Sequence, residues 1–184
     1  LQRGDRLGGL VFSQQEHREV RPRRSRRSVL GLLNALVELN NALPHPAPDT
    51  SQSFTDMLVE LRRIARPGSS VFIISDFRGA LTDESLEQMH SLARHLEITA
   101  LHCSDPLERE LPESGGYVVT DGESRTKLFT GESRLRDAYA ARYQHTLTAL
   151  RQALGKLGIP MIEADTTDSP LGVLLAYYAG AARR

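Results

Sequence analysis

The sequence predicts an α/β fold with a mostly parallel β-sheet. An uninterrupted apolar run at residues 71–74 and a largely apolar segment at 97–103 are typical of buried strands. Segments whose apolar residues recur every three or four positions, as on one face of a helix, flank both. This alternation favours right-handed crossovers in a parallel sheet with helices on both faces. Residues 71–74 are expected to form a central strand that is buried on both faces.

The first third of the chain is predicted to form a hairpin and two helices. The hairpin pairs residues 9–12 with residues 17–20, which alternate polar and apolar side chains. The first helix, at about residues 28–43, has one apolar face, and a proline-rich loop separates it from the second helix. The second helix begins at Ser53 or Thr55, either of which is a suitable N-cap.

The rest of the chain continues this alternation with one interruption. Three more helices are expected at residues 82–96, at 135–157 and from Pro170 onward, and one more strand is expected at 159–164. Residues 117–120 and 126–129 flank an Asp-Gly turn at 121–124, which predicts a small β-hairpin. This hairpin is expected to be an insert at the surface.

Composition limits the class of protein. The chain has 184 residues, 40% of them hydrophobic, and its 23 Lys and Arg balance 23 Asp and Glu, as in a soluble globular protein. The lone cysteine, Cys103, favours a reducing compartment, and no apolar stretch reaches the roughly 18 residues that a membrane span needs. We therefore expect one domain over residues 1–184 in a reducing compartment, which begins mid-protein because its first residue is Leu1.

The sequence contains no short motif for dinucleotide, phosphate, esterase or zinc-protease chemistry. The first candidates for a functional site are therefore two aspartates. Asp76 and Asp105 follow consecutive predicted strands, at the carboxyl edge where open α/β sheets bind ligands. Their oxygen atoms would suit Mg²⁺. The alternative is that each aspartate caps a helix or ends a turn. For Asp105 the capping role is favoured, whereas for Asp76 both interpretations stay open.

Two further groups of residues have a simpler interpretation. His102 and Cys103 are neighbours on a predicted strand and point to opposite faces, so packing is favoured over a nucleophilic pair. Six arginines lie between residues 18 and 27 and could contact phosphates or nucleic acid. Because the whole chain is neutral, a solvated helix entrance or a protein-docking surface is favoured instead, and nucleic acid is not the expected partner.

Six segments of the chain form a recognisable set. They are residues 4–13 (GDRLGGLVFS), 21–24 (RPRR), 75–77 (SDF), 105–108 (DPLE), 111–112 (LP) and 116–117 (GY). In this order, over nearly the whole chain, they resemble the domain of unknown function (DUF) 58 family. The Asp-Pro-Leu-Glu segment is the most specific part of the resemblance.

The resemblance implies a Rossmann-like von Willebrand factor type A sandwich. Type A domains hold a metal-ion-dependent adhesion site, formed by an Asp-x-Ser-x-Ser loop, a threonine and an aspartate, and Thr55 and Asp76 match the last two. The loop is absent here and would precede Leu1, so the chain is expected to hold half of a site for Mg²⁺ or Mn²⁺ and to bind neither by itself. The strand before that loop would lie mid-sheet, so the isolated chain is expected to be unstable or sticky.

The resemblance also implies a cytoplasmic location and a function. The chain is expected to be a non-enzymatic protein-interaction module, an adaptor or partner of a MoxR-type AAA+ ATPase, with no catalytic residue, organic cofactor or small-molecule substrate. The alternative is a metal-dependent α/β hydrolase in which Asp76 and Asp105 hold a metal that activates water.

Overall fold

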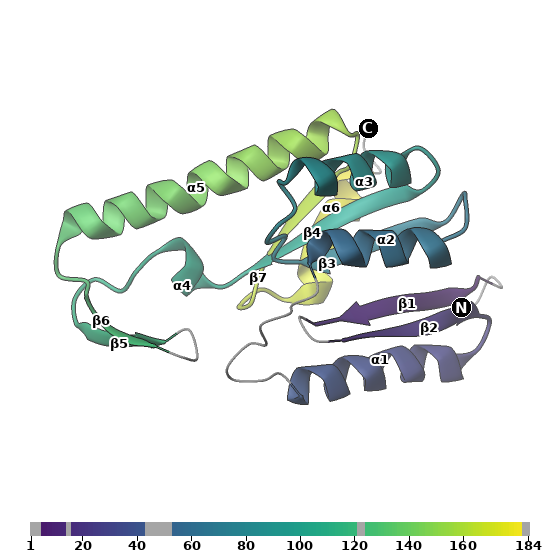
Figure 1. Ribbon diagram of the computed structural model, residues 1–184, viewed down its shortest axis with the longest axis horizontal. Coiled ribbons are helices and arrows are strands. Elements are labelled where there is room, and N and C mark those ends of the chain that lie inside the picture. The colour runs from purple at the N-terminus through teal and green to yellow at the C-terminus, as the bar shows by residue number, and fades with distance from the viewer. Residues whose placement is uncertain (1–4, 14–15, 43–52, 121–123, 182–184) are drawn as a thin grey trace. The chain divides into compact units, whose positions relative to one another are not determined.

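A computed structural model of the chain describes residues 5–13, 16–42, 53–120 and 124–181 (Figure 1). Backbone contacts divide the chain into two compact units, Leu1–Ile64 with Thr120–Ser124, and Ala65–Val119 with Arg125–Arg184. The expectation that residues 1–184 form one domain stays a prediction.

The first unit is built on an antiparallel hairpin followed by two helices. Its elements are β1 (Leu7–Phe12), β2 (His17–Arg23), α1 (Arg26–Asn41) and α2 (Phe54–Ile64). The register pairs Gly9 with Val20 and Phe12 with His17, which confirms the predicted hairpin. On α1, Ala35 and Leu39 form a small buried cluster with Val11 of β1, and Leu32 packs against it.

Both helices of this unit begin with a serine cap. The Ser25 side chain accepts a hydrogen bond from the Ser28 N–H at 3.2 Å, so α1 begins slightly before the predicted residue 28. At α2 the Ser53 hydroxyl accepts from the Asp56 N–H at 3.1 Å, and the Asp56 carboxylate accepts from the Ser53 N–H at 2.8 Å. The Ser53 N–H, together with the Ser53 hydroxyl, which also donates to this carboxylate at 2.8 Å, lowers the pKa of Asp56. Ser53 is therefore the N-cap, and Thr55 lies in the first turn.

The second unit is a parallel sheet with helical connections (Figure 1). Its strands are β3 (Ser70–Ser75), β4 (Glu97–Ser104) and β7 (Met161–Asp165), in the order β3-β4-β7. Its helices are α3 (Asp83–Ala93), α4 (Pro106–Arg109), α5 (Ser133–Lys156) and α6 (Pro170–Ala181). Helix α3 contacts β4, while α5 and α6 contact β7. The parallel pairing confirms the predicted α/β class, and α4 is a short helix that the sequence pattern did not indicate.

Strand β3 differs from the expectation of a central strand buried on both faces. Within the described residues it pairs only with β4, so it is an edge strand. Ile73 is buried, but Phe72 and Ile74, on the other face, are 46% and 63% exposed. The expectation was wrong because an apolar run indicates only that burial of a strand is favourable. It does not indicate which elements will cover each face of the strand. An uncharged edge of this kind is a template for pairing with a further strand.

A second hairpin projects from the parallel sheet and confirms the predicted insert (Figure 1). It consists of β5 (Gly116–Thr120) and β6 (Arg125–Phe129), while most of its expected Asp-Gly turn, residues 121–123, lies outside the described residues. Arg136 of α5 anchors its base by donating to the carbonyls of Glu113 and Thr130 at 2.9 and 2.6 Å.

No helix in the described ranges combines the length and the apolar character required to cross a bilayer.

Candidate functional site

Each strand of the parallel sheet is followed by, or ends with, an aspartate at its carboxyl end. Asp76 follows β3, Asp105 follows β4 and Asp165 is the last residue of β7. Parallel strands bring these ends to one edge of the sheet, where open α/β folds bind ligands. Sequence analysis identified the first two residues and missed Asp165. A similar signal was available, because Asp165 directly follows the strand predicted at 159–164, and Asp76 follows the apolar run at 71–74 after one serine.

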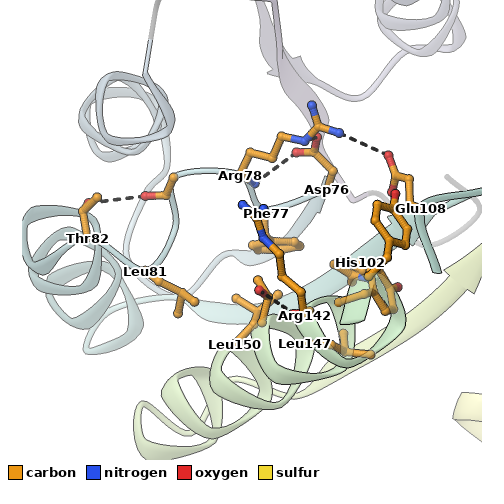
Figure 2. A pocket seen from close by; sticks show the side chains of 14 residues that line it. Asp76, Phe77, Arg78, Leu81, Thr82, His102, Glu108, Arg142, Leu147 and Leu150 are labelled. Atoms are coloured by element: carbon orange, nitrogen blue, oxygen red, sulfur yellow. Dashed lines mark hydrogen bonds and ion pairs between the residues drawn. The ribbon is translucent and has the colours of Figure 1, made fainter. Parts of the chain in front are cut away.

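Asp76 is held by its own loop (Figure 2). One carboxylate oxygen accepts from the Arg78 N–H at 3.1 Å, and the other lies 3.0 Å from the Arg78 Nε. The same guanidinium also contacts Glu108 at 3.2 Å. Because the Arg78 and Asp76 side chains are 79% and 44% exposed, this ion pair contributes only about 1 kcal/mol or less. Arg78 is therefore a partner that a ligand of Asp76 can displace at low cost.

Phe77 reverses the direction of the loop and places its ring under it. Its φ of 57° lies in the left-handed region, which is strained for a residue with a side chain, and its ring is only 4% exposed. The ring stacks on His102 of β4 with centroids 6.3 Å apart and planes 25° from parallel. The buried contact of the Phe77 ring therefore offsets the backbone strain at this residue.

Asp105 has the capping role that sequence analysis favoured. One carboxylate oxygen accepts from the Leu107 N–H at 2.9 Å, at the N-terminus of α4. The other accepts from the Thr166 hydroxyl at 2.7 Å and so joins the loops that follow β4 and β7.

Asp165 organises the same edge from the third strand. Its carboxylate accepts from the Thr167 N–H at 2.9 Å and from the Thr167 hydroxyl at 2.8 Å, and it pairs with Arg109 of α4. The hydrogen bonds from Thr167, with a smaller contribution from Arg109, lower the pKa of Asp165.

This lowered pKa predicts a pH dependence of stability. A carboxyl group whose pKa is lower in the folded state stabilises the fold above its unfolded pKa, and this contribution is lost as the pH falls through the folded value. We expect Asp165→Asn to be less stable than wild type at pH 7 and to approach it as the pH falls below the ordinary aspartate pKa of about 4. Urea unfolding followed by circular dichroism at pH 7, 5 and 3 measures this, and Thr167→Val should reproduce part of the change. Parallel pH profiles for wild type and Asp165→Asn would contradict the assignment.

The two residues that the resemblance assigns to a metal lie in different units. Thr55 is in the first turn of α2, in the first unit, and Asp76 is in the second. Among the described residues no three His, Cys, Asp or Glu side chains converge in a way that could hold a metal ion. Two oxygen donors are fewer than Mg²⁺ requires, so Thr55 and Asp76 do not fit a complete site by themselves.

His102 and Cys103 do not form a nucleophilic pair. His102 is buried and Cys103 half-buried, at successive positions of β4 whose side chains point to opposite faces. Burial lowers the pKa of His102, whereas burial, with the nearby Asp76 charge, raises the pKa of the Cys103 thiol. A protonated thiol is a poor nucleophile, which agrees with the packing role predicted for it.

The arginine run lies in the first unit, on β2 and at the start of α1. Arg18 pairs with Glu16 and Glu38, and Arg21 with Glu19. Arg23, Arg24, Arg26 and Arg27 are exposed and make no ion pair within the described part of the chain.

These features define an α/β protein whose parallel sheet carries loop-organising aspartates at its carboxyl edge. The model of the family "Protein of unknown function DUF58" matches residues 1–149, and the chain belongs to this family.

Several known proteins are similar to the chain. The uncharacterized proteins Mb1516 of Mycobacterium bovis and Rv1480 of Mycobacterium tuberculosis are each 26% identical over 182 residues, which is 98% of this chain and 55% of theirs. The uncharacterized protein MAV169 of Mycobacterium avium is 30% identical over 107 residues, 58% of this chain and 62% of its own. The chain thus spans about half the length of the first two relatives. A solved structure, the conserved hypothetical protein BatB from Bacteroides thetaiotaomicron, is 12% identical with a TM-score of 0.47, over 98% of this chain and 81% of its own.

Proposed function

We propose that this chain is a non-enzymatic protein-interaction module, a cytoplasmic adaptor or partner of a MoxR-type AAA+ ATPase. The proposal takes its parallel sheet to be part of a von Willebrand factor type A sandwich. Membership of the DUF58 family supports the choice of partner, because the family resemblance implies association with such ATPases.

The observation that carries the proposal is the apolar surface of the projecting hairpin. Val118 and Val119 on β5 are 62% and 50% exposed, and Phe129 on β6 is 69% exposed. Leu107, on α4, is 62% exposed. Val118 and Val119 are successive strand residues and so expose apolar side chains on both faces of the hairpin. Large apolar side chains exposed on one projecting element are typical of a segment that binds another protein. Arg136 holds the base of the hairpin through its two hydrogen bonds, and this fixes the position of the exposed side chains relative to α5.

The metal part of the proposal assigns Thr55 and Asp76 as two ligands of Mg²⁺ or Mn²⁺, with a carboxylate of the bound partner as a third. The low cost of displacing Arg78 from Asp76 supports it. In the alternative hydrolase, Asp76 and Asp105 would hold the metal. That function is less well supported, because both Asp105 oxygens already accept hydrogen bonds, from Leu107 and Thr166.

Capture of the MoxR-type ATPase of the same organism tests the proposal. Immobilised wild-type chain is expected to retain the ATPase in Mg²⁺ and to retain less in EDTA. Phe129→Ser should weaken capture about tenfold or more through lost apolar contact, and Asp76→Ala should remove the Mg²⁺ dependence. Asp137→Ala, an exposed change on α5, is the matched control and should behave as wild type.

The outcomes separate the parts of the proposal. No capture by wild type in any buffer would contradict the adaptor role. Capture that is equal in Mg²⁺ and EDTA would contradict the metal role while leaving the adaptor role standing. Metal-dependent hydrolysis of a substrate that requires both Asp76 and Asp105 would favour the hydrolase instead.

A further inference from the structure

A pocket of about 650 Å³ opens in the second unit between the loop after β3, strand β4 and helix α5 (Figure 2). Its apolar floor is formed by Phe77, Leu81, Leu147 and Leu150. Phe77, Leu147 and Leu150 are at most 7% exposed, so these side chains are fixed by packing. The volume lies in the range of sites that bind small ligands or single peptide residues.

His102 lines this pocket as a largely buried polar group. The residue is 7% exposed, and within the described residues its imidazole has no hydrogen-bond partner, only the ring contact with Phe77. Because burial lowers the pKa of His102, the ring is neutral near pH 7 and offers one N–H donor and one nitrogen acceptor.

Arg142 supplies a positive charge to the same pocket. It extends from α5 towards the loop that carries Phe77 (Figure 2). In the described part of the chain it forms no ion pair, whereas Arg78, which also lines the pocket, is neutralised by Asp76 and Glu108. Arg142 is therefore the cation of this pocket that is available to an anionic ligand.

We propose that this pocket binds the carboxyl-terminal residue of a peptide, where that residue has an apolar side chain. Arg142 pairs with the terminal carboxylate, His102 hydrogen-bonds the adjacent peptide group, and the side chain packs on Phe77 and the leucines. Such a residue has one group for each feature of the pocket. Its α-carboxylate matches the cation, its amide matches the neutral imidazole, and its aliphatic side chain matches the apolar floor. The inference rests on the proposed interaction function and specifies one chemical group of the partner.

Three probes separate the features of the ligand. N-acetyl-leucine carries all three, N-acetyl-leucinamide lacks the carboxylate, and N-acetyl-aspartate lacks the apolar side chain. The tripeptide acetyl-Ala-Ala-Leu, with a free carboxyl terminus, distinguishes a peptide from a small acid as the source. Binding to the full chain is followed by calorimetry and by shifts of the pocket amides in ¹H–¹⁵N spectra. The tripeptide and N-acetyl-leucine are expected to bind, with the tripeptide tighter, and the other two about tenfold or more weaker.

Variants assign the binding to the pocket. Arg142→Gln should weaken tripeptide binding about tenfold or more and remove the preference for the carboxylate over the amide. Arg134→Gln, an exposed change on the same helix outside the pocket, is the matched control and should have no effect. His102→Phe keeps an aromatic ring against Phe77 but removes the hydrogen bond, and should weaken binding of the tripeptide.

Each contrary result overturns the inference in a defined way. Equal binding of acid and amide, or no effect of Arg142→Gln, would exclude the carboxylate contact. No binding of any probe at about 1 mM would exclude the pocket as a site for such residues. Tighter binding of N-acetyl-leucine than of the tripeptide would identify a small-molecule acid as the ligand in place of a peptide. Because ATPase capture is measured separately, failure here leaves the proposed adaptor role standing, and failure of capture leaves this binding measurable.

Discussion

Phe77→Ala is expected to lower the free energy of unfolding by about 3–5 kcal/mol, the usual range for truncating a buried phenylalanine. The ring is 4% exposed and stacks on His102, so its removal opens a cavity between the loop and β4. Alanine keeps the strain of the left-handed φ of 57° while losing the contact that offsets it. Since a domain has only about 5–15 kcal/mol of stability, this one change removes a large part of it. Urea unfolding followed by circular dichroism measures the loss.

Phe77→Gly is the control that separates packing from strain. Glycine adopts a positive φ without the cost of about 1–2 kcal/mol that other residues have there. We therefore expect Phe77→Gly to be about 1 kcal/mol more stable than Phe77→Ala, the reverse of their order in a helix. An alanine variant as stable as wild type would show that the ring is not packed as described.

Leu154→Ala is expected to destabilise the second unit by about 2–5 kcal/mol. Leu154 is 1% exposed on α5, a helix that contacts β7, so truncation leaves a cavity that the surrounding side chains fill only in part. Leu171→Ala is the matched control, because Leu171 on α6 is 67% exposed and its truncation should change stability by less than about 0.5 kcal/mol. The same unfolding measurement applies, and equal effects of the two substitutions would contradict the assignment of α5 to the core.

Local sequence patterns were sufficient for most elements of the fold. Both hairpins, the long helix α5 and the three parallel strands lie close to the predicted ranges, because turn residues and apolar periodicity act over a few neighbouring positions. The serine cap of α2 was one of two candidates, and only the reciprocal hydrogen bonds between Ser53 and Asp56 distinguish it from Thr55.

The candidate site was predicted only in part. The edge that carries Asp76 and Asp105 follows from the order of strands, and the capping role of Asp105 from the preference for Asp at caps and turns, although the helix that it caps, α4, was not predicted. Thr55 and Asp76 as metal ligands came from the family resemblance, and that assignment stays a prediction. Asp165 was missed although its position after an apolar segment repeats the pattern of the other two aspartates.

The sequence by itself determined the class of fold, the order of its elements and the family, because these depend on local periodicity and on short segments that stay contiguous along the chain. Only the tertiary structure decided that, within the described residues, β3 is an edge strand with Phe72 and Ile74 exposed, and that the buried His102 makes no hydrogen bond there and lines a pocket with Arg142. The physical reason is that burial and pairing are properties of residues distant in sequence. Residues 102 and 142 line one pocket only in the folded chain, and no local pattern records which elements will cover a given face.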